Sequence, residues 1–537
     1  MSQATTNTNP TPDNISQRER RRILLKEIDN AKFGWFHIRA CIVSGIGFFT
    51  DAYDLFAINI VSTMLAYVYF GTITLPGNLD TGLKISAAVG TLVGQLLFGW
   101  LADVLGLELI IMIVATFGSA IASNSFAVSV IGLIIFWRVI LGIGVGGDYP
   151  LSAVITSEFA TTKRRGAMIA AVFAMQGFGI LASALISYIT LLGYKSYIES
   201  NIQALDYCWR IVIGLGAVPA FVALYYRLTI PETPRFTIDI EGNYDQASKD
   251  VITYIPKSED DNTVSATTTV AESQVINPLD STSEKKSSNF YTWGEFWSHF
   301  GQWKHGKVLL GTSLSWFALD VAFYGLGLNN AIILDAIGLS SKTDDQFTGL
   351  ANIALGNVVI TLLGTIPGYW VTVFTVDKIG RKTIQLLGFT MLTILFIILG
   401  FGYHAILDKS VVLFIFFQNF GPNTTTFIIP GEVFPTKYRS TAFGISAASG
   451  KFGAIVAQIG FFQMKDIGGK NAFLPHLFEI SALIMFIGLL ATFLVPETKG
   501  ISLEDLAGLI FASNTVNGEA RDMSADPLFL RKASAMA

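Results

Sequence analysis

Apolar residues along the chain gather in long blocks, which short polar stretches separate. A block of about 20 residues forms a helix long enough to cross a hydrocarbon core of about 30 Å. Lipid offers a bare backbone no hydrogen-bond partner, so the blocks are predicted to be helices. The pattern predicts twelve: 40–68, 83–102, 108–127, 129–153, 166–194, 210–229, 308–336, 347–375, 383–402, 409–433, 441–463 and 474–495.

This arrangement predicts an all-α polytopic membrane protein with twelve transmembrane helices in two six-helix halves. The expected divisions are an N-terminal segment (1–39), a first half (40–229), a linker (230–307), a second half (308–495) and a C-terminal tail (496–537). The linker is polar and poor in apolar residues. Near its end Trp293, Phe296, Trp297 and Phe300 recur at helical spacing. They predict a helix that lies on the membrane surface or packs as a lid on the helix ends.

Composition agrees with a membrane protein. Hydrophobic residues make up 51% of the chain and charged residues only 14%, whereas soluble domains carry about a quarter charged residues. The net charge of −4 gives no sign of a nucleic-acid partner. Two distant cysteines and five scattered histidines predict neither a disulfide framework nor a metal site. No cofactor motif or catalytic constellation stands out, so the chain is not expected to be an enzyme.

Basic residues in the short flanks predict the orientation. Cytosolic flanks of membrane helices carry an excess of Lys and Arg. In the twelve-helix topology the following basic flank residues all lie on one side: Arg18, Arg20, Arg21, Arg22, Lys26, Lys163, Arg164, Arg165, Lys378, Arg381, Lys382, Lys437 and Arg439. Both termini and the linker are therefore expected in the cytosol.

The two halves repeat each other. The run EFATTKRRG begins at Glu158 after the fourth predicted helix, and EVFPTKYRS begins at Glu432 after the tenth. The sixth helix ends in PETPR and the twelfth in PETKG. Paired halves with a site at their interface are typical of alternating-access transporters.

Six ionisable residues are candidates for the membrane interior: Asp51, Asp54, Arg138, Asp148, Asp320 and Lys451. Each costs at least ~2.5 kcal/mol at a helix centre, so partners or a wet cavity must exist. Asp51 and Asp54 are three residues apart and share a helix face. Two carboxylates that close repel each other, which favours a proton on one of them. They are predicted proton carriers, unless both are ion-paired or reach the water interface.

Polar groups from both halves are expected to meet near the midplane. Trp316, Asp320 and Tyr324 are spaced by four along one helix face. The other candidates occupy matching positions of the two halves: Tyr149 with Asn423, and Gln176 with Lys451. These side chains can donate to an oxyanion, whose binding is favourable only while a nearby acid is protonated. Phosphate suits such a site, but the chemistry leaves a sugar or a carboxylate open.

Three runs resemble the phosphate:proton symporters of the major facilitator superfamily. They are RVILGIGVGGDYPLS from Arg138, PGYWVTVFTVDKIGRK from Pro367, and FGPNTTTF from Phe420. The resemblance extends from about Phe33 to Leu503 and is strongest to fungal high-affinity phosphate importers of the plasma membrane. It implies the major facilitator fold and proton-coupled import of inorganic phosphate across the lipid bilayer.

The resemblance also implies roles for single residues. The matching positions of the phosphate site are Tyr149, Gln176, Trp316, Asp320, Tyr324 and Asn423, and Lys451 matches a lysine of substrate coupling. Asp51, Asp54 and Asp148 match acids of proton translocation. From the charges we expect Arg138 to pair with these acids, and Asp320 to join proton and substrate binding.

One segment departs from the family. The superfamily usually carries basic residues in the loop between helices 2 and 3. Here Asp103 and Gly106 are followed at once by Leu107 and Glu108, so the basic pair is absent. This loop helps to lock the inner gate, and normal gating is therefore in question.

Two other functions remain open from the sequence. One is proton symport of another solute, such as a sugar or a glycerophosphodiester, because PETPR and PETKG are shared with sugar-porter relatives. The other is a nutrient receptor that signals through the cytosolic segments. Regulatory factors are conceivable partners of the linker and of the tail after Ile510.

Overall fold

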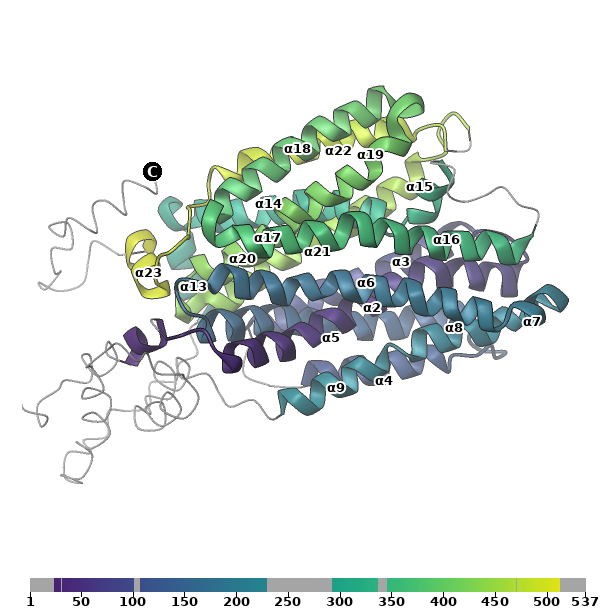
Figure 1. Cartoon of the computed structure of the whole chain (residues 1–537), viewed down its shortest axis with the longest axis horizontal. Helices are drawn as coiled ribbons and strands as arrows, with labels where there is room; N and C mark the ends of the chain where they lie inside the picture. The colour runs from purple at the N-terminus through teal and green to yellow at the C-terminus, as the bar shows by residue number, and fades with distance from the viewer. Residues whose placement is uncertain are drawn as a thin grey trace, which may run out of the picture.

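The computed structural model describes residues 24–29, 31–100, 107–228, 292–336, 345–469 and 471–511. The loop at Asp103, most of the linker, the first basic residues and the end of the tail lie outside this part, and so do the predictions that rest on them. Within it, ten helices are long and apolar enough to cross a membrane, and a shorter apolar helix covers Glu108–Ala120. The helices lie side by side in an elongated bundle (Figure 1).

The first half contains α2 (Trp35–Phe70), α3 (Gly77–Trp100), α4 (Leu107–Ala120), α5 (Val130–Phe159), α6 (Arg165–Gly193), and the pair α8 (Leu205–Gly214) and α9 (Ala217–Arg227). The second half contains α14 (Trp303–Gly327), α16 (Gln346–Ile360), η4 (Thr361–Thr365), α17 (Ile366–Ile379), α18 (Arg381–Phe401), α19 (Tyr403–Gln418), η5 (Asn419–Asn423), α20 (Thr424–Val433), α21 (Arg439–Met464) and α22 (Leu474–Thr492). Together they fill the twelve predicted positions.

Three predicted helices are interrupted rather than continuous. The sixth breaks between α8 and α9, at Leu215 and Gly216. The eighth and tenth contain the π-helical segments η4 and η5. In η5, Phe420 and Gly421 leave helical geometry just before Pro422, because proline lacks the N–H that a regular helix needs. Such π-segments occur often at functional sites.

Several predicted boundaries differ from the structure by five residues or more, among them those of α4 and α14. α4 ends at Ala120 and not at the predicted residue 127. The side chains of Asn124 and Ser129, which follow it, accept hydrogen bonds from the amides of Val130 and Gly132 at the start of α5. α14 begins at Trp303, ahead of the predicted residue 308, and ends at Gly327. A separate short helix, α15 (Asn330–Ala336), continues the predicted span after a turn.

Glycines bring α3 and α5 close together. A Cβ on Gly142 would lie 2.2 Å from the Ala87 carbonyl oxygen, and one on Gly146 would lie 2.4 Å from that of Thr91. Gly90 of α3 meets the backbone of α5 in the same way. The two backbones are therefore in direct contact, which is how small residues join membrane helices.

The aromatic helix predicted at the end of the linker is α13 (Trp293–Phe300). Phe296 and Phe300 are buried and pack against Tyr438, between α20 and α21. Trp293 and Trp297 are exposed. One face of α13 is thus a lid on the helix ends, and the opposite face is free to meet the membrane surface.

Figure 1 places α13 and α23 (Leu503–Phe511) at one end of the bundle and α7 (Lys195–Ser200) and α15 at the other. We call these the α13 end and the α15 end. The largest core cluster extends across both halves between the two ends. It contains Phe48 and Tyr149 of the first half and Trp316 and Phe427 of the second, so the interface between the halves is itself core.

Candidate functional site

The centre of the candidate site is a buried ion pair. The Lys451 ammonium on α21 lies 2.9 Å from an Asp320 carboxylate oxygen on α14. It also donates to the Tyr324 hydroxyl at 2.9 Å. All three side chains are at most 4% exposed. An isolated buried charge is very costly, so the pair and the phenol together make Lys451 tolerable at this depth.

The first half reaches the same ammonium. The Lys451 nitrogen lies 5.2 Å from the centroid of the Tyr149 ring of α5, and 4.3 Å from that of Tyr324. Trp316 joins from α14, because a Cβ on Gly450 would lie 2.4 Å from the Trp316 ring. Five of the predicted site residues, Lys451 included, therefore meet in one place.

For the other two predicted substrate residues, Asn423 and Gln176, the described contacts are with groups other than Lys451. Asn423 donates from its amide to the Tyr369 hydroxyl at 2.7 Å and to the Asn419 side chain at 2.8 Å. Gln176 on α6 is buried, and its Nε2 has no hydrogen-bond partner among the described residues. Its neighbour Gly177 packs against the Tyr369 ring. The sequence analysis missed Tyr369, although it lies within the quoted run from Pro367.

Aromatic rings enclose the site on both sides. Toward the α13 end, Phe427 of the second half packs on Phe48 and Phe173 of the first, with ring centroids 5.1 and 4.4 Å apart. Toward the α15 end, Phe56 of α2 packs on Phe323 and Tyr324, at 5.7 and 6.1 Å. Each layer joins the two halves, so the polar centre is closed off in both directions.

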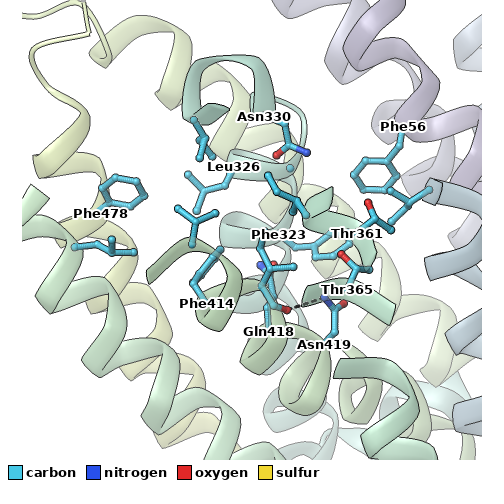
Figure 2. Close-up of a pocket in the computed structure, with 17 residues that line it drawn as sticks. Phe56, Phe323, Leu326, Asn330, Thr361, Thr365, Phe414, Gln418, Asn419 and Phe478 are labelled. Carbon is cyan, nitrogen blue, oxygen red and sulfur yellow. Dashed lines mark hydrogen bonds between the residues drawn. The ribbon is translucent and has the colours of Figure 1, made fainter. Parts of the chain in front are cut away.

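A small cavity lies beside the second aromatic layer (Figure 2). Its volume is about 60 Å³. Phe56 and Phe323 form part of its wall, and the polar groups of Thr365 and Gln418 line it from η4 and the end of α19. Nε2 of Gln418 is buried without a hydrogen-bond partner among the described residues. The two π-helical segments thus border a cavity next to the candidate site.

The predicted acids of the first half form a second cluster. Asp51 is fully buried, and neither of its carboxylate oxygens has a hydrogen-bond partner among the described residues. It is close enough to Asp148 and Asp54 for their charges to interact. A buried carboxylate with such neighbours is best accommodated with a proton.

Arg227 of α9 is the charge partner of Asp148, and the sequence analysis missed it. Its guanidinium bonds to Asp148, to Glu108 at 2.8 Å and to the Ser152 hydroxyl at 2.8 Å. The side chain is only 8% exposed. Arg227 lies at the end of an apolar run, where a basic residue is ordinarily a cytosolic flank. For this reason no pattern in the sequence indicated that Arg227 pairs with the buried acids.

Arg138 lies beside Asp54, as predicted, but it does not hydrogen-bond to the carboxylate. It donates to the Asp54 backbone carbonyl at 3.2 Å and to that of Leu83 at 3.3 Å. The Asp54 carboxylate instead accepts from the Thr116 hydroxyl of α4 at 3.1 Å. Arg138 therefore ties α5 to α2 and α3 and acts on Asp54 through its charge.

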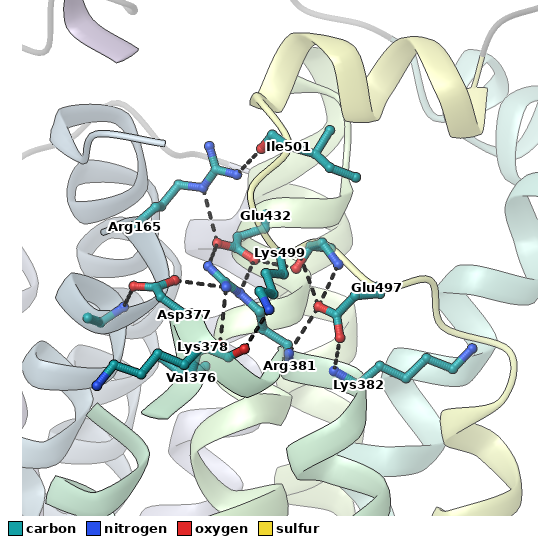
Figure 3. A network of polar contacts seen from close by, with 12 residues as sticks. Arg165, Val376, Asp377, Lys378, Arg381, Lys382, Glu432, Glu497, Lys499 and Ile501 are labelled. Atoms are coloured by element: carbon teal, nitrogen blue, oxygen red, sulfur yellow. Dashed lines mark hydrogen bonds and ion pairs between the residues drawn. The ribbon is translucent and has the colours of Figure 1, made fainter. Parts of the chain in front are cut away.

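A charged network closes the α13 end (Figure 3). Glu432 of α20 binds Arg165 of the first half at 3.1 Å and Arg381 of α18 at 2.9 Å. Asp377 of α17 also crosses between the halves, because its carboxylate accepts from the Ala167 amide of α6 at 2.9 Å. Glu497 accepts from the Arg381 and Lys382 amides, both at 3.0 Å, and so caps α18.

The two repeated runs bind each other crosswise. Glu432 of the second half pairs with Arg165 of the first, and Arg439 of the second pairs with Glu158 of the first at 3.5 Å. Each run thus supplies an acid and a base to the opposite run. The sequence repeat indicated paired halves, but it did not reveal this exchange.

The site combines groups that can donate hydrogen bonds with buried acids. Among the described residues, no group of three or more His, Cys, Asp or Glu side chains could hold a metal ion. What the geometry provides is one ammonium, two phenols and an indole around an acid, with a separate acidic cluster in the first half. This arrangement can bind an oxyanion and can hold protons without any further group.

Comparisons with known proteins agree on one family. The family model described as sugar (and other) transporter matches residues 40–509. The chain is 49% identical to the repressible high-affinity phosphate permease of Neurospora crassa, over 91% of this chain and 90% of the relative. It is 47% identical to the inorganic phosphate transporter PHO84 of Saccharomyces cerevisiae, over 91% and 87%. A structure of the proton:xylose symporter XylE superimposes with a TM-score of 0.68 at 20% identity, over 88% of this chain and 99% of that one.

Proposed function

The chain belongs to the sugar (and other) transporter family of the major facilitator superfamily, and from this premise we propose that it imports inorganic phosphate together with protons by alternating access. Its relatives at 47–49% identity are phosphate transporters, and the match covers 87–90% of their length. The two six-helix halves, with a polar centre between them, are the architecture that alternating access requires.

The observation that carries the proposal is the contact between Lys451 and Asp320 at 2.9 Å. While Asp320 is ionised, it neutralises Lys451 and repels an anion. A proton on Asp320 removes that charge and frees the ammonium for a phosphate oxygen, with Tyr324, Tyr149 and Trp316 as further donors. Proton and anion then favour each other's binding, which is the thermodynamic requirement for symport.

The acidic cluster of the first half supplies a second place for a proton. Asp51 lacks a partner among the described residues, whereas Asp148 is held by Arg227. Because no described cation is bonded to it, Asp51 is the better candidate for the proton carrier. Asp54 and Arg138, which lie further toward the α15 end of α2 and α5, set the electrostatic surroundings of this step.

The α13 end is proposed to face the cytosol. It carries the basic loops at Lys163 and Lys378, as expected for cytosolic flanks. In this orientation both termini and the linker are cytosolic, and transport runs inward from the α15 end. The membrane in this proposal is the plasma membrane. Regulatory factors would then act on the linker and tail; neither a nucleic-acid partner nor a cofactor is part of the proposal.

The test is labelled phosphate uptake into proteoliposomes, with and without an inward proton gradient, by the native chain and Asp320→Asn. We expect gradient-driven uptake by the native chain. The variant should lose net uptake driven by the gradient, because an amide cannot exchange a proton. The matched control is Glu199→Gln, which removes an acid from an exposed i, i+4 pair on α7.

Each contrary outcome has a defined meaning. Native uptake that ignores the proton gradient would retain the substrate and remove the coupling. Absence of phosphate uptake by folded native protein would refute the proposal and favour another solute, such as a sugar or a glycerophosphodiester. A receptor would give phosphate-dependent signalling without uptake.

A further inference from the structure

Two side chains of the first half hold one turn of the second half at the α15 end. Asn59 of α2 donates from Nδ2 to the Gly327 carbonyl at 2.8 Å. Lys84 of α3 donates from Nζ to the Asn329 side-chain oxygen at 3.0 Å. Both acceptors belong to the turn between α14 and α15. These two hydrogen bonds join the halves at the end opposite to the charged network.

The same turn is connected to the candidate phosphate site. Asn329 donates from its amide to the Gln458 side chain of α21 at 3.2 Å, and Gln458 donates to the Tyr324 backbone carbonyl. The Tyr324 hydroxyl contacts the Lys451 ammonium. A continuous chain of polar contacts therefore leads from Lys84, near the surface, to the cation at the centre.

The cavity of Figure 2 lies directly beneath these contacts. Gly327, which accepts from Asn59, lines it together with Leu326, Asn330 and Phe56. Leu326 is only 8% exposed. Separation of the turn from the first half would join this cavity to the α15 surface, next to Phe323 and Tyr324.

We propose that Asn59 and Lys84 form the outer latch of the transporter, and that Gln458 makes closure of this latch depend on the anion bound at Tyr324 and Lys451. The inference rests on phosphate transport as proposed above and deepens it. Asn59, Lys84 and Gln458 are positioning residues. The bonds that Asn59 and Lys84 make across the halves go to the turn, and Gln458 bonds to the turn and to the Tyr324 backbone.

The chemistry of the latch suits a contact that must open in every cycle. Lys84 is held from its own half by Asp80 at 2.8 Å, so its ammonium keeps a partner when Asn329 moves away. The Asn59 amide becomes hydrated in the open state. Neither group is left as a bare buried charge or amide, which would make opening prohibitive. An anion bound by both Tyr324 and Lys451 holds the end of α14 in place. It therefore favours the position of the turn in which the latch is closed.

The test measures how fast a thiol beneath the latch is labelled. Leu326→Cys is introduced with Cys41→Ala and Cys208→Ala, and phosphate uptake by this reporter is verified in proteoliposomes. The purified reporter then reacts with a maleimide, with and without phosphate. Phosphate should slow the reaction. Asn59→Ala and Lys84→Met should each raise the labelling rate about fivefold to tenfold, because each variant loses one hydrogen bond that holds the latch closed. Lys84→Arg should keep the labelling rate of the reporter.

Gln458→Leu separates the coupling from the latch. It removes the link to Tyr324 but leaves both contacts across the halves, so the labelling rate without phosphate should stay near that of the reporter while protection by phosphate disappears. In uptake assays Lys84→Met should lower the maximal rate more than it changes KM, because it alters closure and not the bound anion. The matched control is Lys465→Met, since Lys465 pairs with Asp466 within its own half.

The outcomes distinguish the latch from the function. If neither the native chain nor the reporter transports phosphate, phosphate transport itself fails, and the inference fails with it. If phosphate is transported and protects the thiol, but the Asn59 and Lys84 variants react like Lys465→Met, the latch is refuted. Protection that survives in Gln458→Leu would refute the coupling.

Discussion

At the scale of single residues, the buried pair of Asp320 and Lys451 dominates the chemistry. A buried pair contributes little net stability, because desolvation offsets the attraction between the charges. Removing one partner is different, because it leaves an uncompensated charge in a place without water. The pair is therefore better explained by function than by stability.

Lys451→Met tests this explanation. The change leaves Asp320 beside the Tyr324 phenol without a cation, and it should destabilise the protein by about 3–5 kcal/mol and abolish uptake. The measurements are thermal unfolding in detergent and phosphate uptake.

The double variant Asp320→Asn with Lys451→Met is the control for that experiment. It removes both charges, so it should recover most of the lost stability without recovering transport. Uptake by the double variant would contradict the assignment of the pair to the phosphate site.

Which residues could be predicted follows from the same physics. An ionisable residue in the middle of an apolar block is visible in the sequence because lipid cannot accommodate it, and Asp51, Asp320 and Lys451 were found in this way. Arg227 and Glu108 lie at the ends of such blocks, where charged residues are common. Their contact joins α4 to α9, and no local pattern indicates it.

At the scale of elements, the polar centre depends on close packing of α14 and α21. Gly450 lies against Trp316, and a Cβ added to it would be 2.4 Å from the indole and 2.9 Å from an Asp320 oxygen. The absence of a side chain at Gly450 is what allows Lys451, the next residue, to reach Asp320.

Gly450→Ala should therefore impair the site without changing any polar group. The methyl group forces the indole or the carboxylate to move, which should cost about 1–3 kcal/mol of stability and reduce uptake strongly. Gly349→Ala is the matched control, because a Cβ on that glycine of α16 would meet no atom within 4 Å. Equal uptake by the two variants would show that the close approach is unimportant.

Helices were predictable as elements, but their interruptions were not. Apolar blocks located the spans because only helices satisfy the backbone in lipid. The break at Gly216 and the π-segments at Thr361–Thr365 and Asn419–Asn423 depend on neighbours from distant parts of the chain. Gly421, for example, packs against Gly388 of α18, and periodicity along the sequence carries no information about that contact.

At the scale of the whole molecule, contacts between the halves exist at both ends. Glu432 holds Arg165 and Arg381 at the α13 end, and the turn at Gly327 is held at the α15 end. The described state is thus closed in both directions around the site. Movement to either open state requires one of these two sets of contacts to break.

Glu432→Gln should shift this balance. The amide leaves two buried guanidinium groups, Arg165 and Arg381, without their shared anion, so they repel each other and the α13 end opens. We expect faster labelling of Ala153→Cys, introduced with Cys41→Ala and Cys208→Ala, and slower phosphate uptake. Ala153 is fully buried, and it lies between the halves, because a Cβ on Gly431 of α20 would be 3.8 Å from its Cβ. Glu479→Gln is the control, because Glu479 pairs with His476 within one half. Unchanged labelling would exclude the network as a gate.

The crosswise exchange between Glu158, Arg165, Glu432 and Arg439 has a consequence for how the molecule is assembled. In a symmetric dimer, one patch meets its own copy and every contact occurs twice. The ion pairs Glu432–Arg165 and Glu158–Arg439 are related in the same way, except that the two halves are joined in one chain. Each half therefore already carries the complement of its counterpart, and the covalent connection mainly raises their local concentration. Two separately synthesised halves should consequently recognise each other and assemble into a working carrier.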